Sequence, residues 1–377
     1  MAHGDKNLAP KLQIEAVQTV TPFKATDPRQ TLRVLATDPV GSGIFRRCLN
    51  IVVYYKKALE EDSGWIAAGW IKESLGRVLA EQPMLSGRLR RSEDGGVGEL
   101  EIVSNDSGVR LIEAKISITM SEFLDDQLQE SEDAESELVF WKDIDDQNPQ
   151  FSPLFYLQMT NFECGGYSIG ISCNLLLADI LIKENFFQKW ANIHKDILSQ
   201  NNSPKSTHIF YLPYLKKASC NPDIPISSNQ VKKKGKTMIF KITDDNLISL
   251  EKESNKKLIL ARVEEVEREL GNNKMASKFP VFLRESSKSD KIKIEYCSKY
   301  VDEMVHSHEL DFKNQVRRAS WDDLGASEID FGQGNKPSRV AYWIGSILDG
   351  FVVATSSPSD SDQSTTSGFN IIVSVPS

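Results

Sequence analysis

This sequence lacks the features that mark secreted, membrane-spanning and nucleic-acid-binding proteins. It has only five cysteines, and none forms a Cys-x-x-Cys pair, so reduced thiols in a cytosolic setting fit better than a disulfide framework. No apolar run of about 18 residues occurs, and no basic segment leads into an apolar core near residue 1. We therefore expect neither a transmembrane helix nor a signal peptide, and a cytoplasmic location. The net charge of −8 argues against a nonspecific nucleic-acid binder, because such proteins need clustered Lys and Arg.

Histidine, the usual catalytic base near neutral pH, is scarce as well. His306 and His308 stand two apart, as metal ligands on a strand can, but no third ligand follows at a recognisable spacing. We interpret both as surface residues and expect no metal site. The other three cannot be placed in a substrate channel from the sequence: His3 lies near residue 1, His194 in a predicted helix and His208 in a predicted linker.

What is present is enough apolar material for two domains, with 40% hydrophobic residues in 377. The segment from Ser199 to Gly235 is rich in Asn, Ser, Pro and Lys and is too long for an ordinary connection. We therefore predict an N-terminal domain at 1–198, a crossover linker at 199–236 and a C-terminal domain at 237–377. The carboxylate-rich segment at 125–146 is interpreted as a solvated face.

Hydrophobic spacing predicts both helices and strands. Period-2 or β-branched runs predict strands at 11–22, 47–56, 99–103, 109–114, 237–242, 291–296, 338–354 and 369–375. Apolar residues three or four apart predict helices at 65–79, 119–129, 180–198 and 244–270. Because a turn-forming segment joins the strands at 99–103 and 109–114, we predict that they form a hairpin.

The most informative segment is residues 163–180, in which Gly165-Gly166 leads into an apolar strand that ends in Leu175-Leu-Leu-Ala-Asp179. Three further segments stand in a fixed order around it: Lys72-Glu-Ser-Leu with Leu85-Ser-Gly-Arg-Leu, Phe151-Ser-Pro-Leu, and Asp330-Phe331-Gly332-Gln333-Gly334 followed by Lys336-Pro337. Together they resemble the plant BAHD family of HXXXD-type acyl-CoA-dependent acyltransferases, in which the strand ends in His-x-x-x-Asp and the later motif reads Asp-Phe-Gly-Trp-Gly. Within that family the segments are most similar to the Eceriferum-type subgroup.

The resemblance implies an α/β fold of two domains, similar to chloramphenicol acetyltransferase, with mixed sheets and flanking helices. The second domain is expected to be shortened. Between Glu253 and Glu295 we find no counterpart of the family's Trp-bearing helix and following strand.

The resemblance places Leu175 where relatives have the catalytic histidine. Leucine has no proton acceptor, and loss of a general base costs about 10²–10⁴ in rate. If the strand continued, Cys173 and Leu175 would share a face, which makes Cys173 the nearest polar candidate. A free cysteine in an apolar strand is more often a core residue than a nucleophile. Recruitment of another base stays open.

Structural roles are implied for the remaining motif residues, which are Asp179, Asp330, Phe331, Gly332, Gln333 and Gly334. In relatives the motif aspartate is held by an arginine and is turned away from the substrate channel. Arg339 is our candidate for that arginine.

The resemblance thus implies an acyltransferase-like protein, impaired or non-catalytic, with no covalently bound cofactor and with acyl-CoA as ligand or co-substrate. By analogy with the Eceriferum-type members, it would act as a monomer with a fatty-acid elongase condensing enzyme at the endoplasmic reticulum, in very-long-chain fatty acid elongation for cuticular wax. The alternative is an active O- or N-acyltransferase of plant specialised metabolism that uses another base. A different reaction in the same tunnel, such as a lyase or an intramolecular transfer, is a third hypothesis.

Overall fold

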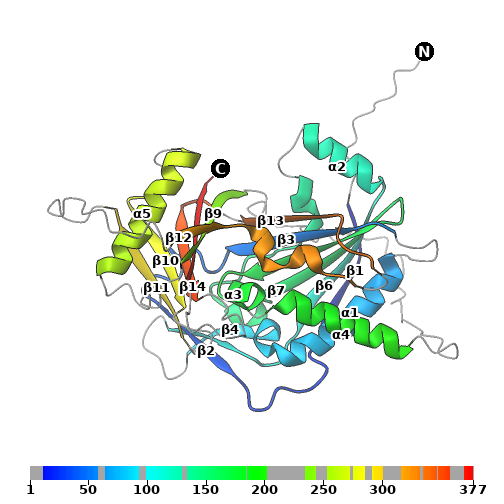
Figure 1. Ribbon diagram of the computed structural model, residues 1–377. Coiled ribbons are helices and arrows are strands. Elements are labelled where there is room, and N and C mark those ends of the chain that lie inside the picture. Colours follow the sequence, from blue (N-terminus) through cyan, green and yellow to red (C-terminus); the bar gives the residue numbers. More distant parts are fainter. Residues whose placement is uncertain are drawn as a thin grey trace, which may run out of the picture.

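The computed structural model describes residues 12–57, 64–92, 99–129, 134–183, 185–201, 234–242, 253–271, 275–284, 291–299, 316–331, 334–345, 347–356 and 369–376. In this part of the chain the strands form two sheets, which lie side by side in Figure 1. The six-stranded sheet has the order β1 (Gln13–Val20), β6 (Val109–Ile116), β7 (Phe155–Phe162), β8 (Tyr167–Asn174), β3 (Cys48–Tyr55) and β13 (Arg339–Gly345). The nine-stranded sheet has the order β12 (Val316–Ala319), β9 (Gly235–Ile242), β15 (Phe369–Pro376), β14 (Phe351–Ser356), β10 (Lys278–Arg284), β11 (Lys291–Ser298), β2 (Thr31–Ala36), β5 (Leu100–Val103) and β4 (Arg88–Arg91).

Both sheets are mixed, since β6 pairs with β7 and β10 with β14 in parallel, while most other neighbours are antiparallel. Helices flank them: α1 (Gly64–Glu81) packs on β7 and on α4 (Phe186–Asn201), and α5 (Glu253–Leu270) packs on β9 and β15. Two shorter helices are α2 (Met120–Gln129) and α3 (Ala178–Lys183). The predicted α/β fold with mixed sheets and flanking helices is confirmed. None of the helices in the described residues is both long and apolar enough to cross a bilayer.

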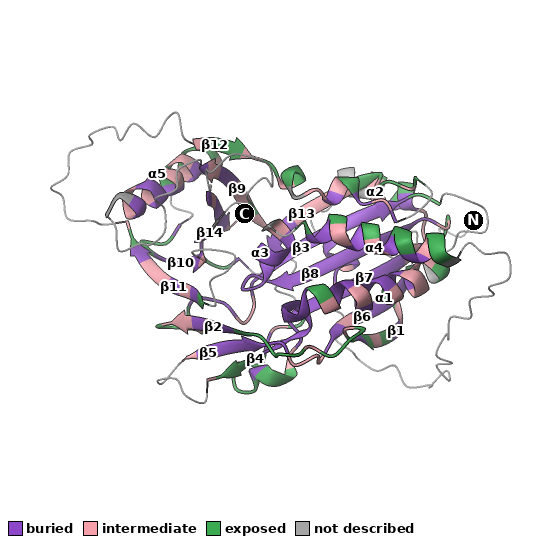
Figure 2. Ribbon diagram, turned by 60° about the horizontal axis from the view of Figure 1, so that its bottom comes forward, coloured by how far each residue is buried: buried purple, intermediate pink, exposed green. Residues whose placement is uncertain are grey.

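The centre of the six-stranded sheet is fully buried, which explains the near-continuous apolar sequence of its strands. Every residue of β3 and of β8 is buried, and Figure 2 shows both strands in the colour of buried residues within the six-stranded sheet. A strand that is covered on both faces has no need of alternating polar residues. The motif strand β8 therefore ends within the buried core.

The strands predicted at 99–103 and 109–114 exist, but the predicted hairpin is wrong. β5 pairs with β2 and β4, whereas β6 pairs with β1 and β7. The connection bonds to other segments, because the Ser104 amide donates to Gln30 O (3.0 Å) and the Gly108 amide donates to Ser86 O (3.1 Å). Gly108 has a φ of +77°, which lets the chain pass from one sheet to the other.

Two predicted elements are each two separate elements in the structure. The strand expected at 338–354 is two strands, β13 and β14, which belong to different sheets. The helical segment at 180–198 is α3 and α4, and Asn185 between them has a φ of +49°. The helix predicted at 244–270 ends as expected, with Gly271 donating to Glu267 O at 3.0 Å, but residues 243–252 lie outside the described residues.

Each sheet combines strands from both sides of the predicted linker, since β13 pairs with β3 and β11 with β2. Residues 202–233 of the linker lie outside the described part of the chain, so the domain limits stay a prediction. The acidic segment is not wholly solvated. Glu135 is only 6% exposed and accepts hydrogen bonds from Lys234 Nζ and Arg339 Nη2, both at 3.0 Å.

Candidate functional site

The motif strand β8 is followed by a turn at residues 175–177, which leads into α3. Asn174, the last residue of β8, holds this turn: its Nδ2 donates to Ile44 O (2.6 Å) and its Oδ1 accepts from the Leu176 amide (3.0 Å). The Leu175 amide donates to Arg47 O at 3.3 Å. Leu175 therefore lies beyond the end of β8. We had expected Leu175 to share a strand face with Cys173, and because the strand has ended it does not continue that alternation.

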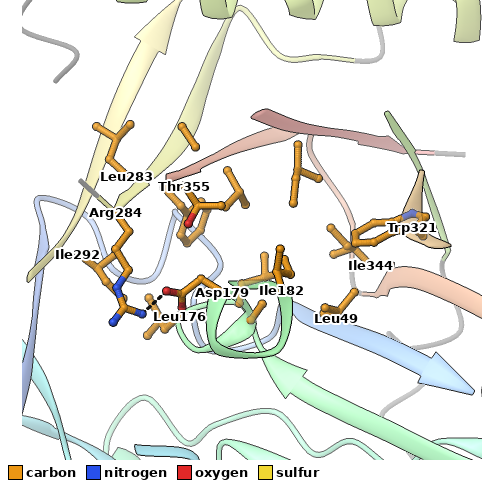
Figure 3. Close-up of a pocket in the computed structure, with 16 residues that line it drawn as sticks. Leu49, Leu176, Asp179, Ile182, Leu283, Arg284, Ile292, Trp321, Ile344 and Thr355 are labelled. Carbon is orange, nitrogen blue, oxygen red and sulfur yellow. Dashed lines mark hydrogen bonds and ion pairs between the residues drawn. The ribbon is translucent and has the colours of Figure 1, made fainter. Parts of the chain in front are cut away.

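Leu175 lines a pocket between α3 and the nine-stranded sheet, with an empty volume of about 500 Å³ that includes its open mouth. We call it the Leu175 pocket. Figure 3 shows its walls, which come from the turn at 175–176, from α3, β3, β10, β11, β13, β14 and β15, and from Trp321. Most of the lining is aliphatic, for example Leu49, Ile182, Ile292, Ile344 and Val353. Such a surface suits a hydrocarbon chain.

One ion pair interrupts the apolar lining. Arg284 at the end of β10 donates from Nη1 to Asp179 Oδ2, and the two side chains are only 12% and 10% exposed. The contact is drawn in Figure 3. Our assignment of Arg339 as the partner of Asp179 is wrong, because Arg339 instead binds the buried Glu135. Asp179 is held by an arginine, as the resemblance implied, yet it lines the pocket.

Neither Cys173 nor His194, the two candidates from the sequence that lie in the described residues, lines this pocket. Cys173 is fully buried in the core, and burial raises the pKa of its thiol well above the usual value, so it stays protonated. His194 lies on α4 with its Nδ1 3.0 Å from Ser74 Oγ, and burial lowers its pKa to about 4. Neither residue is among those that line the pocket. His3, His208, His306 and His308 lie outside the described residues.

The Asp330-Phe331 segment packs beside α4 rather than in the Leu175 pocket. The Phe331 ring lies 4.9 Å from the rings of both Trp190 and His194, and Asp330 pairs with Lys195 at 3.4 Å. Gly334 has a φ of +78°. Gly332 and Gln333 lie outside the described residues.

A polar groove adjoins the Leu175 pocket and shares Ile182, Trp321 and Ile372 with it. Its empty volume, which includes open solvent, is about 800 Å³. Strand register explains why the groove is polar and the Leu175 pocket is apolar, because residues paired across a sheet point to the same face. One row of paired residues across this face is polar or cationic: Arg317, Lys241, Asn370, Thr355 and Arg284.

We call this set the polar row. The neighbouring row is apolar and consists of Ala319, Ile239, Ile372, Val353 and Phe282. The groove is lined by Arg317, Lys241 and Asn370 of the polar row, and the Leu175 pocket by Thr355 and Arg284. The two cavities together are thus apolar at one end and cationic at the other.

The sequence did not reveal the polar row. β10 and β12 were not predicted, and without the sheet order nothing in the sequence brings Arg284 next to Thr355 or Arg317 next to Lys241. Only the ends of the strands at 237–242 and 369–375 gave a partial signal, in the polar residues Lys241 and Asn370 among apolar neighbours.

Comparisons with known proteins bear on this site. The sequence profile of the Transferase family matches residues 11–284. The chain is 34% identical over 124 residues to Protein ECERIFERUM 26-like of Arabidopsis thaliana (32% of this chain, 27% of that protein). It is 32% identical over 146 residues to Hydroxycinnamoyltransferase of Narcissus pseudonarcissus (38% and 32%), so the matches span about a third of these relatives. The crystal structure of vinorine synthase aligns with a TM-score of 0.46 at 13% identity, covering 97% of this chain and 95% of that one.

Proposed function

We propose, from the premise that this chain belongs to the Transferase family, that it binds an acyl-CoA thioester beside Leu175 and transfers the acyl group far more slowly than an ordinary enzyme does. Family membership confirms the resemblance to plant acyltransferases. The replacement of the motif histidine by Leu175 stays a prediction, on which the slow transfer depends.

The composition of the pocket wall is the observation that carries the proposal. Leu175 contributes an aliphatic side chain, and Asp179 is the only proton acceptor with a side-chain carboxylate or imidazole among the described lining residues. An attacking hydroxyl or amine must lose its proton during acyl transfer, and an aliphatic wall cannot accept it. The same wall favours the binding of an acyl chain.

The polar row supports an anionic partner for the apolar pocket. Lys241 and Arg317 line the adjoining groove, although Asp323 also lies there and offsets part of their charge. Coenzyme A carries phosphates, which bind Lys and Arg side chains. We therefore place the acyl chain in the Leu175 pocket and the phosphates towards Lys241 and Arg317.

Calorimetric titration of the protein with palmitoyl-CoA tests this placement. Leu175→Trp should block binding, whereas Leu348→Trp, at a leucine that is 45% exposed outside the pocket, should not. Lys241→Met should weaken binding and reduce its salt dependence. Lys236→Met is the matched control, because Lys236 lies on the same strand and points to the opposite face. Equal effects of the two lysine variants would overturn the placement.

We further propose that the protein assists a fatty-acid elongase condensing enzyme at the endoplasmic reticulum, in very-long-chain acyl elongation for wax. The similarity to Protein ECERIFERUM 26-like supports this role by analogy only. Co-expression with a condensing enzyme should lengthen the acyl chains, and Leu175→Trp should abolish the effect. Unchanged chain lengths would count against the role.

Asp179 favours a second candidate, an active O- or N-acyltransferase that uses another base. Its carboxylate lines the pocket, and its Oδ1 has no hydrogen-bond partner in the described structure. If the wild type transfers acyl groups to an alcohol and Asp179→Asn does not, while Asp179→Asn remains folded and binds acyl-CoA, this candidate replaces the first.

A further inference from the structure

Two cations face each other on the wall of the polar groove. Arg317 of β12 and Lys241 of β9 are directly paired across antiparallel strands, so their side chains point to the same face. Like charges directly opposite each other destabilise a sheet. Within the described residues neither side chain has an ion-pair partner. Arg317 is exposed and Lys241 is half-buried, so a ligand in the groove can reach both.

The next residue of β12, Arg318, is treated differently by the fold. It points to the opposite face, where its guanidinium contacts Glu265 and Glu269 of α5. The strand thus carries a neutralised arginine on the α5 side and, at Arg317, a cation on the groove side that the described carboxylates leave unpaired. This contrast indicates that the charge in the groove serves an anionic ligand.

Hydrogen-bond donors outnumber acceptors on this wall of the groove. Lys241 offers three N–H donors, Arg317 five and the Asn370 amide two. Asp323 also lines the groove, and its Oδ2 accepts from the Ser320 amide at 3.3 Å. A phosphomonoester carries nearly two charges and three strong acceptor oxygens, whereas a carboxylate carries one charge and two oxygens. A phosphate therefore matches the two cations better than a carboxylate does.

The apolar row begins close to these cations. Ile372 lies on the strand next to Lys241, two residues along from the residue paired with it. Strands lie about 4.8 Å apart and each residue rises about 3.4 Å, so the two Cα atoms are about 8 Å apart. Ile372, Ile182 and Trp321 line both the groove and the Leu175 pocket, and Figure 3 labels the last two. A chain that starts at the cations therefore reaches the pocket directly.

Coenzyme A separates its phosphates from the thioester by an arm as long as about four extended residues, or about 14 Å. A phosphate ester of the chain itself has no such arm. We propose that the groove and the Leu175 pocket together bind a single-chain lipid phosphate, with the phosphomonoester at Lys241 and Arg317 and the chain over Ile372. The inference goes beyond the proposed function, because this ligand carries no coenzyme A, and it rests on that function only for the chain beside Leu175. The two ligands share the anion site and therefore compete.

Calorimetric titration with octyl phosphate, octanoate and inorganic phosphate tests the two halves of the ligand separately. We expect octyl phosphate to bind about tenfold more tightly than octanoate, because its second charge meets the second cation. It should bind at least about a hundredfold more tightly than inorganic phosphate, since each buried methylene group tightens binding about fourfold. Equal binding within either pair, or no binding of octyl phosphate, would overturn the inference.

Variants on two strands locate the anion. Arg317→Met should weaken octyl phosphate binding about 3- to 10-fold. Arg318→Met is the matched control and should leave binding unchanged, because Arg318 points away from the groove. Lys241→Met should act like Arg317→Met, and Lys236→Met, on the opposite face of β9, should not. Leu175→Trp should remove the gain from the chain and leave inorganic phosphate binding unchanged. Folded Arg317→Met and Lys241→Met proteins that bind octyl phosphate like the wild type would contradict the site.

Two lipids separate a bound molecule from a membrane surface: 1-palmitoyl lysophosphatidic acid and vesicles of diacyl phosphatidic acid. The single-chain lipid should displace palmitoyl-CoA, and Leu175→Trp should abolish its binding. Vesicle binding that survives Leu175→Trp, without binding of the single-chain lipid, would reveal a membrane contact and overturn the inference. If palmitoyl-CoA binds but octyl phosphate does not, the proposed function stands and this inference fails. If octyl phosphate binds and palmitoyl-CoA does not, the inference stands and the acyl-CoA placement fails.

Discussion

Loss of one partner of the Asp179–Arg284 ion pair should lower the free energy of unfolding strongly. Both side chains are nearly buried, at 10% and 12% exposure. The pair joins α3, which follows β8 of the six-stranded sheet, to β10 of the nine-stranded sheet. Removal of one partner leaves an uncompensated charge in the interior, which typically destabilises a protein by about 3–5 kcal/mol. We expect this loss for Arg284→Met and for Asp179→Asn, with the larger effect for Arg284→Met because it leaves a bare carboxylate.

Urea unfolding followed by tryptophan fluorescence measures the effect. With a denaturant dependence of about 3 kcal/mol per M, the unfolding midpoint should fall by about 1–2 M. The double variant Asp179→Leu/Arg284→Met should recover most of the loss, because apolar residues of similar volume often replace a buried pair without cost. Lys336→Met is the control: its pair with Glu328 is 62% and 63% exposed and should not change the midpoint measurably. An Arg284→Met midpoint equal to the wild type, or a double variant as unstable as the singles, would refute this reasoning.

Two further predictions concern titratable groups outside the pocket. Because the folded-state pKa of His194 is about 4 against an ordinary value near 6.5, the unfolded state binds more protons between these values, and stability should fall by about 2 kcal/mol from pH 7 to pH 5. His194→Gln should reduce that pH dependence, and an unchanged slope would contradict the assignment. Among the described cysteines, the exposed Cys164 should react with iodoacetamide in the native protein, whereas the buried Cys48 and Cys173, whose pKa values are raised by burial, should not. Rapid modification of Cys173, detected by mass spectrometry, would show that it is a reactive thiol.

The fold class could be predicted because the motif segments resemble a known family and because the buried strands are strongly apolar. Local patterns found β3, β8 and α1, since these elements bury whole faces. The hairpin prediction failed for a physical reason: local spacing shows that two strands exist, but their partners are decided by long-range hydrogen bonds such as that from the Ser104 amide to Gln30 O.

In the candidate site, too, local sequence reveals some residues, and others are brought together only by long-range strand pairing. Leu175 and Asp179 could be found from the motif, because the two positions are fixed relative to each other in the sequence. Arg284 and Thr355 could not, because they are brought together only by the pairing of β10 with β14. The wrong assignment of Arg339 has the same origin, since its partner Glu135 comes from a segment that we expected to be solvated.

The rate of coenzyme A release tests the central claim most directly. Purified protein would be mixed with saturating acyl-CoA and a panel of alcohols and amines, and free thiol would be recorded with time. An ordinary enzyme turns over at about 10 s⁻¹, and a missing general base costs about 10²–10⁴, so we expect release below about 0.1 s⁻¹ although the thioester is bound. Leu175→His should raise the rate if the rest of the site is intact. Wild-type release at about 1 s⁻¹ or faster would contradict the account.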